Sequence, residues 1–175
     1  MKKIIATLLI FSISNEVISQ DSKQMIPLKD FFMERNNRQL NKRDNSYLLI
    51  RCSALYMALS DQTYDKDMGD LDKNGINDPD EKELYSVSLV FLASAIVLYE
   101  PEFTFEDLLR EIGEFFENEE DVPEVVNRSL ALMYDLSDEY NYLIYENFKL
   151  SGKPFNDYYK YDWPFCREMY DKTKP

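Results

Sequence analysis

The residues with the clearest capacity for chemistry lie between positions 70 and 81, where Asp70, Asp72 and Asn74 occupy alternate positions and Gly75 follows. Calcium is a hard cation that takes six to eight oxygen ligands, and alternate positions in a tight loop can direct their oxygens at one centre. Glycine permits the sharp turn that such a loop requires. The run therefore predicts a calcium-binding loop.

This twelve-residue run resembles the calcium-binding loop of EF-hand proteins, and the resemblance covers the loop alone. The sequence departs from the family pattern at the eighth position, where Asn77 replaces the usual apolar residue. Unpaired extracellular calcium modules commonly bind at about 10⁻⁴ to 10⁻³ M. The resemblance implies oxygen ligands from Asp70, Asp72, Asn74, the backbone carbonyl of Ile76, Asp78 directly or through water, and both carboxylate oxygens of Glu81.

The end of the same run also fits a role without metal. Asp78, Pro79 and Glu81 have the order of an N-cap, a first helical residue and a capping-box residue. In that interpretation the run is a solvated acidic connector, and its last residues start the next helix. Both interpretations remain open at this stage.

The composition excludes several kinds of enzyme. The chain has 175 residues and no histidine, which excludes Ser-His-Asp and Cys-His nucleophile systems and histidine-ligated zinc. A carboxylate pair for glycoside hydrolysis needs two carboxyl groups about 5 to 9.5 Å apart. One cluster of five acidic residues could supply such a pair, although a solvated boundary between two helices is the simpler interpretation. Its members are Glu114, Glu117, Glu119, Glu120 and Asp121.

The first nineteen residues have the layout of a secretory signal. Lys2 and Lys3 precede an apolar stretch over residues 4–13, and a more polar segment ends at Ser19. Ten apolar residues are too few to cross a hydrocarbon core of about 30 Å. We therefore expect a signal peptide over residues 1–19, a single exported domain over residues 20–175, and a periplasmic or secreted protein.

Two cysteines, Cys52 and Cys166, lie far apart in the chain. An even cysteine count in an exported chain predicts a disulfide rather than free thiols. The spacing excludes a CxxC redox pair. We expect one disulfide that joins an early helix to the C-terminal segment.

The net charge of −13 disfavours nucleic acid and anionic membranes as partners. The densest basic patch, residues 35–43, is flanked by acids and is interpreted as a solvated helix face. The uncharged run over residues 84–99 is too short to span a bilayer and is expected to be the central buried helix. Aromatic residues are concentrated after position 139; they could contact a protein or carbohydrate partner, but packing of the C-terminal tail is favoured.

Low glycine content and apolar spacings of three and four residues predict an all-α fold, a small bundle of five or six helices. N-terminal caps are expected at Thr104 with Asp107 and at Asp121 with Glu124, and a helix end at Gly152. Helices are expected from Pro27, from Asn45 or Ser46, from Pro79 to Tyr99, from Thr104, from Pro123 to Leu150, and after Asp162.

These features favour an exported, non-enzymatic binding or structural protein that calcium stabilises through the EF-hand-like loop. The first alternative is a small hydrolase that depends on two close carboxylates. The second is a periplasmic holdase chaperone, to which small size, helicity, one disulfide and high charge are suited.

Overall fold

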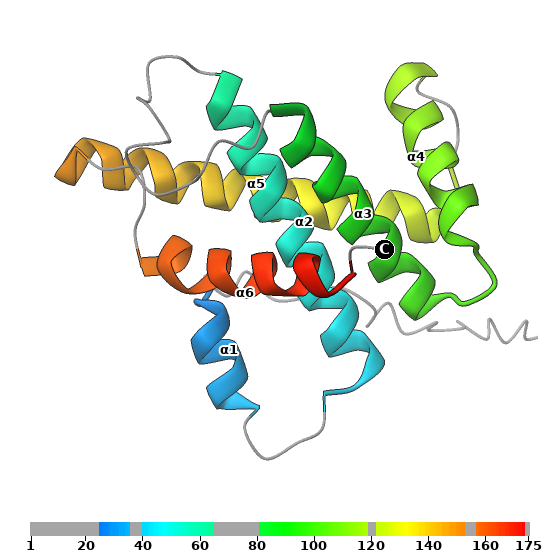
Figure 1. Ribbon diagram of the computed structural model, residues 1–175, viewed down its shortest axis with the longest axis horizontal. Coiled ribbons are helices and arrows are strands. Elements are labelled where there is room, and N and C mark those ends of the chain that lie inside the picture. The colour runs from blue at the N-terminus through cyan, green and yellow to red at the C-terminus, as the bar shows by residue number, and fades with distance from the viewer. Residues whose placement is uncertain (1–24, 36–39, 65–80, 119–121, 153–156, 174–175) are drawn as a thin grey trace, which may run out of the picture.

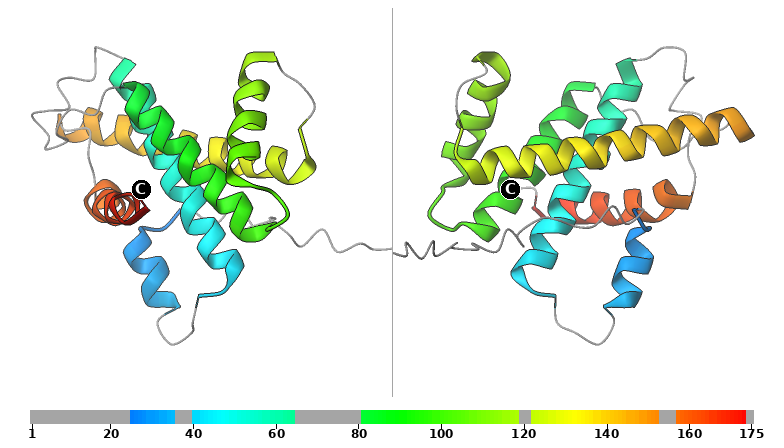
Figure 2. Two further views of the ribbon diagram at one scale, coloured as in Figure 1. Left: turned by 45° about the vertical axis from the view of Figure 1, so that its right-hand side comes forward. Right: turned by 180° about the vertical axis from the view of Figure 1, so that it is seen from behind.

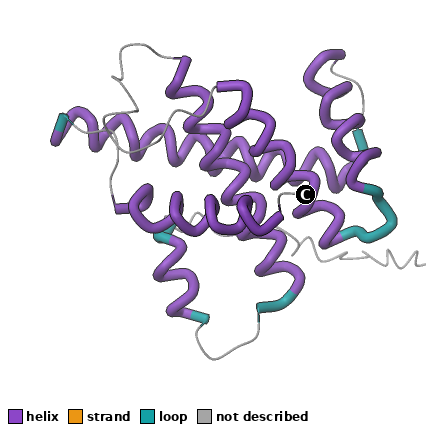
Figure 3. The backbone as a smooth tube through the Cα atoms, viewed as in Figure 1, coloured by secondary structure: helices purple, strands orange, loops and turns teal. Residues whose placement is uncertain are grey.

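The computed structural model describes residues 25–35, 40–64, 81–118, 122–152 and 157–173, and these residues form six helices and no strand (Figures 1 and 3). The predicted all-α fold is confirmed. The helices are α1 (Leu28–Glu34), α2 (Lys42–Tyr64), α3 (Glu81–Tyr99), α4 (Phe105–Asn118), α5 (Glu124–Ser151) and α6 (Asp157–Thr173).

Helices α2 and α3 form an antiparallel pair at the centre of the bundle. On one side α5 crosses the pair, as the rear view shows, and on the opposite side lies α6 (Figures 1 and 2). We expected residues 84–99 to be the central helix, but α2 holds that place, since it contacts α3, α5 and α6. The helices therefore form three layers with α2 in the middle.

Helix α3 is the one described helix whose length and composition would allow it to cross a membrane, over Lys82–Tyr99. That stretch is longer than the uncharged run seen in the sequence. Within it 44% of the residues are buried in the bundle, among them Leu84, Phe91 and Leu92. A core helix of a helical bundle has the same composition, because one face must be apolar throughout.

Small polar residues allow α2 and α3 to approach closely. The Ser53 hydroxyl donates to the Ser88 carbonyl oxygen at 2.8 Å, and the Ser88 hydroxyl donates to the Ser53 carbonyl oxygen at 2.9 Å. Two turns away, the Ser46 hydroxyl donates to the Ala95 carbonyl oxygen at 3.0 Å. Because Ser46 and Ser53 are seven residues apart, as are Ser88 and Ala95, the contacts repeat along one helical face. We call these four residues the serine seam.

The helix starts confirm one predicted cap and shift another boundary. The Asp107 N–H donates to Thr104 Oγ1 at 3.1 Å at the start of α4, as predicted. Helix α2 begins at Lys42, three residues before the earliest expected start. The reason is a reciprocal cap, in which the Asp44 N–H donates to Asn41 Oδ1 at 2.9 Å and the Asn41 N–H donates to Asp44 Oδ2 at 3.3 Å.

The two ends of α5 differ in how well the sequence predicted them. Gly152 ends the helix in the left-handed conformation with φ of 68°, and its N–H donates to the Phe148 carbonyl oxygen at 2.8 Å, as expected. At the other end Pro123, and not Asp121, occupies the N-cap position, and Pro123 makes no side-chain cap. Asp121 itself lies outside the described residues.

Helix α6 is longer than predicted. We expected a short helix after Asp162. The helix instead begins at Asp157 and contains Pro164 in its interior. Asp162 does not cap α6, because a buried arginine and the N-terminus of α1 engage its carboxylate.

Candidate functional site

The predicted calcium ligands lie almost entirely outside the described residues. Only Glu81 is described, as the first residue of α3. Among the described residues there is no group of three or more Asp, Glu or Cys side chains that could hold a metal ion. The calcium site therefore stays a prediction. The ligands outside are Asp70, Asp72, Asn74, Ile76 and Asp78.

The acidic group proposed for carboxylate catalysis is divided in a similar way. Glu114 and Glu117 belong to the last turns of α4, whereas residues 119–121 lie outside the described part of the chain. No separation between their carboxylates is defined. The hydrolase alternative therefore stays a prediction as well.

The predicted disulfide is confirmed. The sulfur atoms of Cys52 on α2 and Cys166 on α6 are 2.04 Å apart, with a Cα–Cα distance of 5.4 Å, and both residues are fully buried. Disulfides persist in oxidising environments and are rare in the reducing cytosol. The bond therefore indicates an oxidising, extracytoplasmic environment.

Next to the disulfide lies a buried charged network that the sequence did not predict. Arg51 Nη2 donates to Asp162 Oδ2 at 2.7 Å, and both side chains are fully buried. Arg51 Nε donates to the Tyr140 hydroxyl at 3.0 Å, which in turn donates to Asp162 Oδ2 at 2.5 Å. The Leu28 N–H, at the start of α1, donates to Asp162 Oδ1 at 2.8 Å. Asp162 thus connects α1, α2, α5 and α6.

The protonation states in this network follow from burial and from the neighbouring charges. Burial raises the pKa of Tyr140 well above its ordinary value of 10, so the phenol stays neutral and serves as a donor. Burial alone would lower the pKa of Arg51, but Tyr140 and Asp162 outweigh it and the net pKa is raised. Because the packed core encloses these groups, the network stabilises the fold and is not accessible to a ligand.

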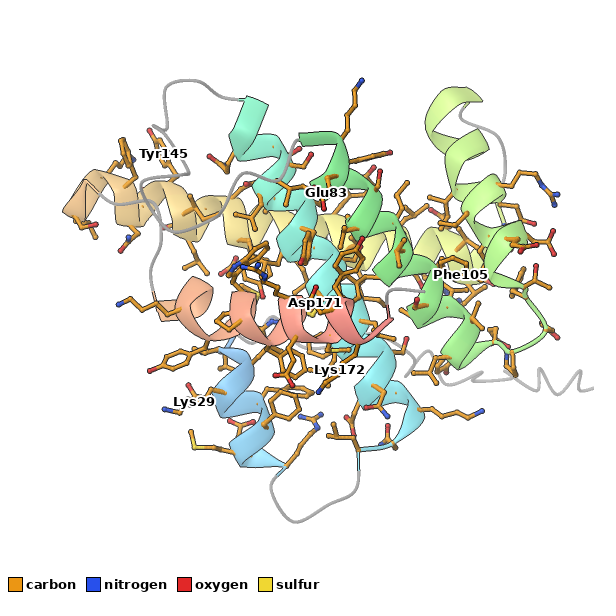
Figure 4. All side chains as sticks on the ribbon, viewed as in Figure 1. Lys29, Glu83, Phe105, Tyr145, Asp171 and Lys172 are labelled. Carbon is orange, nitrogen blue, oxygen red and sulfur yellow. A yellow bond between two sulfur atoms is a disulfide. The ribbon has the colours of Figure 1, made fainter. Side chains whose placement is uncertain are left out.

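The aromatic residues of the C-terminal third divide between packing and exposure. Trp163 packs against Tyr56 of α2, with ring centroids 5.1 Å apart, as the packing interpretation predicted. Tyr142 and Tyr145 are instead exposed on α5, where Tyr145 lies near the C-terminal end of the helix (Figure 4). Tyr161 is also exposed and lies under the ammonium of Lys29 at 4.8 Å.

An open crevice with a volume of about 650 Å³ lies where the N-termini of α2 and α5 meet the C-terminus of α3. Its volume is within the range of ligand sites in proteins, about 300 to 1,000 Å³. Apolar and aromatic side chains form part of its wall. These are Tyr47, Ile50, Tyr99, Val125 and Leu132.

Three of the seven arginines in this acidic chain line the crevice. Arg35 Nε contacts Asp44 Oδ1 at 2.9 Å, and the Arg35 guanidinium lies 4.0 Å from the centre of the Phe31 ring. Arg128 contacts Glu124, one turn away on α5. Arg43 makes no ion pair with any described residue. The patch over residues 35–43 is therefore not one solvated helix face, since it spans the end of α1 and the start of α2.

Two further polar groups of the crevice have no partner in the described part of the chain. Glu100, which follows the C-terminus of α3, has no ion pair there. Ser129 is only 6% exposed, and its hydroxyl has no hydrogen-bond partner among the described residues. In the sequence, Ser129 is the last residue of an Asn-X-Ser pattern at Asn127, which fits an N-glycosylation acceptor but is common by chance. Its seclusion comes from tertiary packing, which that pattern does not indicate.

Comparison with known proteins found no match, whether with protein-family models, with curated proteins or with solved structures. The crevice and the buried network are therefore interpreted from their own geometry.

Proposed function

We propose that this chain is an exported, non-enzymatic binding protein that binds a small ligand in the crevice between α2, α3 and α5. The observation that carries the proposal is the crevice itself, where apolar side chains lie among polar and charged ones, and where Arg43, Glu100 and Ser129 have no side-chain partner among the described residues. Ligand sites commonly combine a concave apolar surface with a small number of convergent polar groups. Export to the periplasm or the medium belongs to this proposal, and the disulfide supports it.

The surrounding frame supports a binding role for the crevice. The disulfide and the Arg51–Asp162 pair both join α2 to α6, so α2 is held on the side opposite α5. A rigid frame lowers the entropic cost of binding, because fewer groups must be ordered when the ligand arrives.

We also propose that the loop over residues 70–81 holds calcium and stiffens the connection between α2 and α3. Helices on both sides of the loop support this proposal, since α2 ends at Tyr64 and α3 begins at Glu81. Millimolar calcium should then raise the melting temperature, whereas magnesium should do much less. Glu81→Gln should remove most of the calcium response and leave the metal-free protein folded. An unchanged melting curve in calcium would refute this site.

Binding in the crevice can be tested by nuclear magnetic resonance on the ¹⁵N-labelled, disulfide-bonded protein. A mixture of small carboxylates, amines and neutral amides is added, and amide shifts are followed. We expect shifts at Arg43, Val125 and Ser129, with the amide of Ser137 on the same helix as an internal control. If no member of the mixture moves the crevice amides, the proposed function is wrong.

A further inference from the structure

Ser129 is the first group in the crevice that points to a particular ligand chemistry. The residue is more than nine-tenths buried, lines the crevice, and has no hydrogen-bond partner among the described residues. Buried polar side chains usually have a partner. The Ser129 hydroxyl oxygen is not among the fully enclosed atoms without a partner, so it is open to the crevice. A ligand in the crevice can supply that partner.

The N-terminus of α5 adds a second preference, for negative charge. A helix leaves its first N–H groups without partners inside the helix, and together they carry a partial positive charge. At α5 Pro123 occupies the N-cap position, and no described residue forms a side-chain cap there. The starts of α2 and α4 differ, since Asn41 and Thr104 cap them. Glu124 and Val125 of this uncapped turn line the crevice.

The arginines of the crevice strengthen the preference for an anion. Arg43 has no ion pair with a described residue, and the contact of Arg128 with Glu124 is exposed to solvent on both sides. Exposed ion pairs contribute little to stability. The Arg128 guanidinium can therefore turn from Glu124 to a bound anion at low cost in free energy. Arginine is suited to carboxylates, because its planar group donates two parallel hydrogen bonds.

The remaining walls define the rest of the ligand. Tyr47, Ile50 and Leu132 offer apolar surface, which favours an apolar or aromatic body. Glu100 lies at the α3 end of the crevice, where its charge and the negative end of the helix repel an anion. Asp44 and Glu124 also line the crevice, but their carboxylates contact Arg35 and Arg128, whereas Glu100 has no ion pair with a described residue. The anionic group of the ligand is therefore directed to the α5 end.

We infer that the crevice recognises a small amphipathic carboxylate, with the carboxylate at Ser129, Arg43, Arg128 and the first turn of α5, and with an apolar body against Tyr47 and Leu132. This inference rests on the proposed binding function and specifies its ligand class.

Calorimetric titration with three probes of the same shape tests the charge preference. The probes are 3-phenylpropionate, 3-phenylpropionamide and 3-phenylpropylamine, each added to the disulfide-bonded protein. We expect the carboxylate to bind with a Kd on the order of 1 mM, as small fragments commonly do, and the amide to bind at least about tenfold more weakly. Equal or tighter binding of the amide or the amine would overturn the inference.

Two serine variants on α5 test the assigned position of the carboxylate. Ser129→Ala should weaken binding of 3-phenylpropionate about tenfold or more, the usual effect of one lost hydrogen bond to a charged group. The melting temperature should not fall, because the hydroxyl makes no bond in the free protein. Ser137→Ala is the matched control on the same helix, since Ser137 is also buried and its hydroxyl has no partner among the described residues, but it does not line the crevice. Equal affinities of the two variants would overturn the assignment.

The outcomes separate this inference from the proposed function. If the amide or the amine moves the crevice amides more than the carboxylate does, the ligand class is wrong and the binding function stands. If neither the three probes nor the fragment mixture moves the crevice amides, both the ligand class and the binding function are wrong.

A second pair of variants tests the arginines. Arg43→Gln and Arg128→Gln should each weaken binding of 3-phenylpropionate about threefold or more and leave the affinity for 3-phenylpropionamide unchanged.

Discussion

At the scale of single residues, Asp162 matters most to the stability of the fold. Its carboxylate accepts from Arg51, from Tyr140 and from the backbone of Leu28, all within the core. A buried ion pair adds little relative to apolar residues, but removal of one partner leaves an uncompensated buried charge. The single and double substitutions should therefore behave very differently.

We predict that Asp162→Asn lowers the free energy of unfolding by about 3–5 kcal/mol, because Arg51 keeps its charge in the core. Urea unfolding under oxidising conditions measures the change. The double variant Arg51→Met with Asp162→Leu should recover most of the loss, since neither charge remains. If the double variant is as unstable as the single one, the loss comes from packing and not from charge.

Tyr140 makes the stability of the protein depend on pH. Its folded pKa lies above the unfolded value, so the stabilisation is fully present below about pH 10 and is lost as the pH rises through the folded pKa. We predict that the protein loses stability above pH 10 and that Tyr140→Phe loses less over the same range. Tyr142→Phe is the control, since Tyr142 is 59% exposed. Parallel curves for the parent and Tyr140→Phe would contradict this account.

At the scale of elements, the serine seam sets the distance between α2 and α3. We predict that Ser88→Leu destabilises the protein by about 1–3 kcal/mol or more, because a larger side chain has no room in the seam and the hydrogen bond from the Ser88 hydroxyl to the Ser53 carbonyl oxygen is lost. Ser86→Leu is the matched control, because Ser86 lies two residues away on the exposed side of α3. Thermal melting compares the two, and equal melting temperatures would show that the seam is loosely packed.

The sequence predicted the helices well where a local signal decides the boundary. Thr104 with Asp107 and Gly152 determine their helix ends by contacts within a few residues, and these ends were confirmed. The boundary at Asp162 was wrong because its carboxylate is used by Arg51, 111 residues away in the chain. Arg51 carried one available signal, since it is a lone charge in the otherwise uncharged apolar stretch beside Cys52.

The crevice was beyond sequence-based prediction for a related reason. Arg43 lies on α2, Glu100 follows α3 and Ser129 lies on α5, and only the packing of the three helices brings them together. Each residue alone has an ordinary local environment. The disulfide, in contrast, could be predicted from the sequence, because an even number of cysteines in a chain expected to be exported was enough to indicate it.

At the scale of the whole molecule, two links join the middle layer to α6. The disulfide closes a separation of 114 residues, and the Arg51–Asp162 pair lies beside it. We predict that Cys52→Ala with Cys166→Ala lowers the free energy of unfolding by about 2–5 kcal/mol, mainly through the unfolded chain. Hydrogen exchange should accelerate first in α6, because only non-covalent contacts, the ion pair and the packing of Trp163 on Tyr56, then join it to α2. Uniform acceleration over all helices would contradict this order.

The central claim is that the junction of α2, α3 and α5 is a binding site, and one titration tests it most directly. The ¹⁵N-labelled protein is titrated with 3-phenylpropionate, and the amide shifts of Arg43, Val125 and Ser129 are followed in the parent and in Ser129→Ala. The account predicts saturable shifts at these positions in the parent and weaker binding in the variant. Absence of saturable shifts at the crevice, or shifts of equal affinity in both proteins, would contradict it.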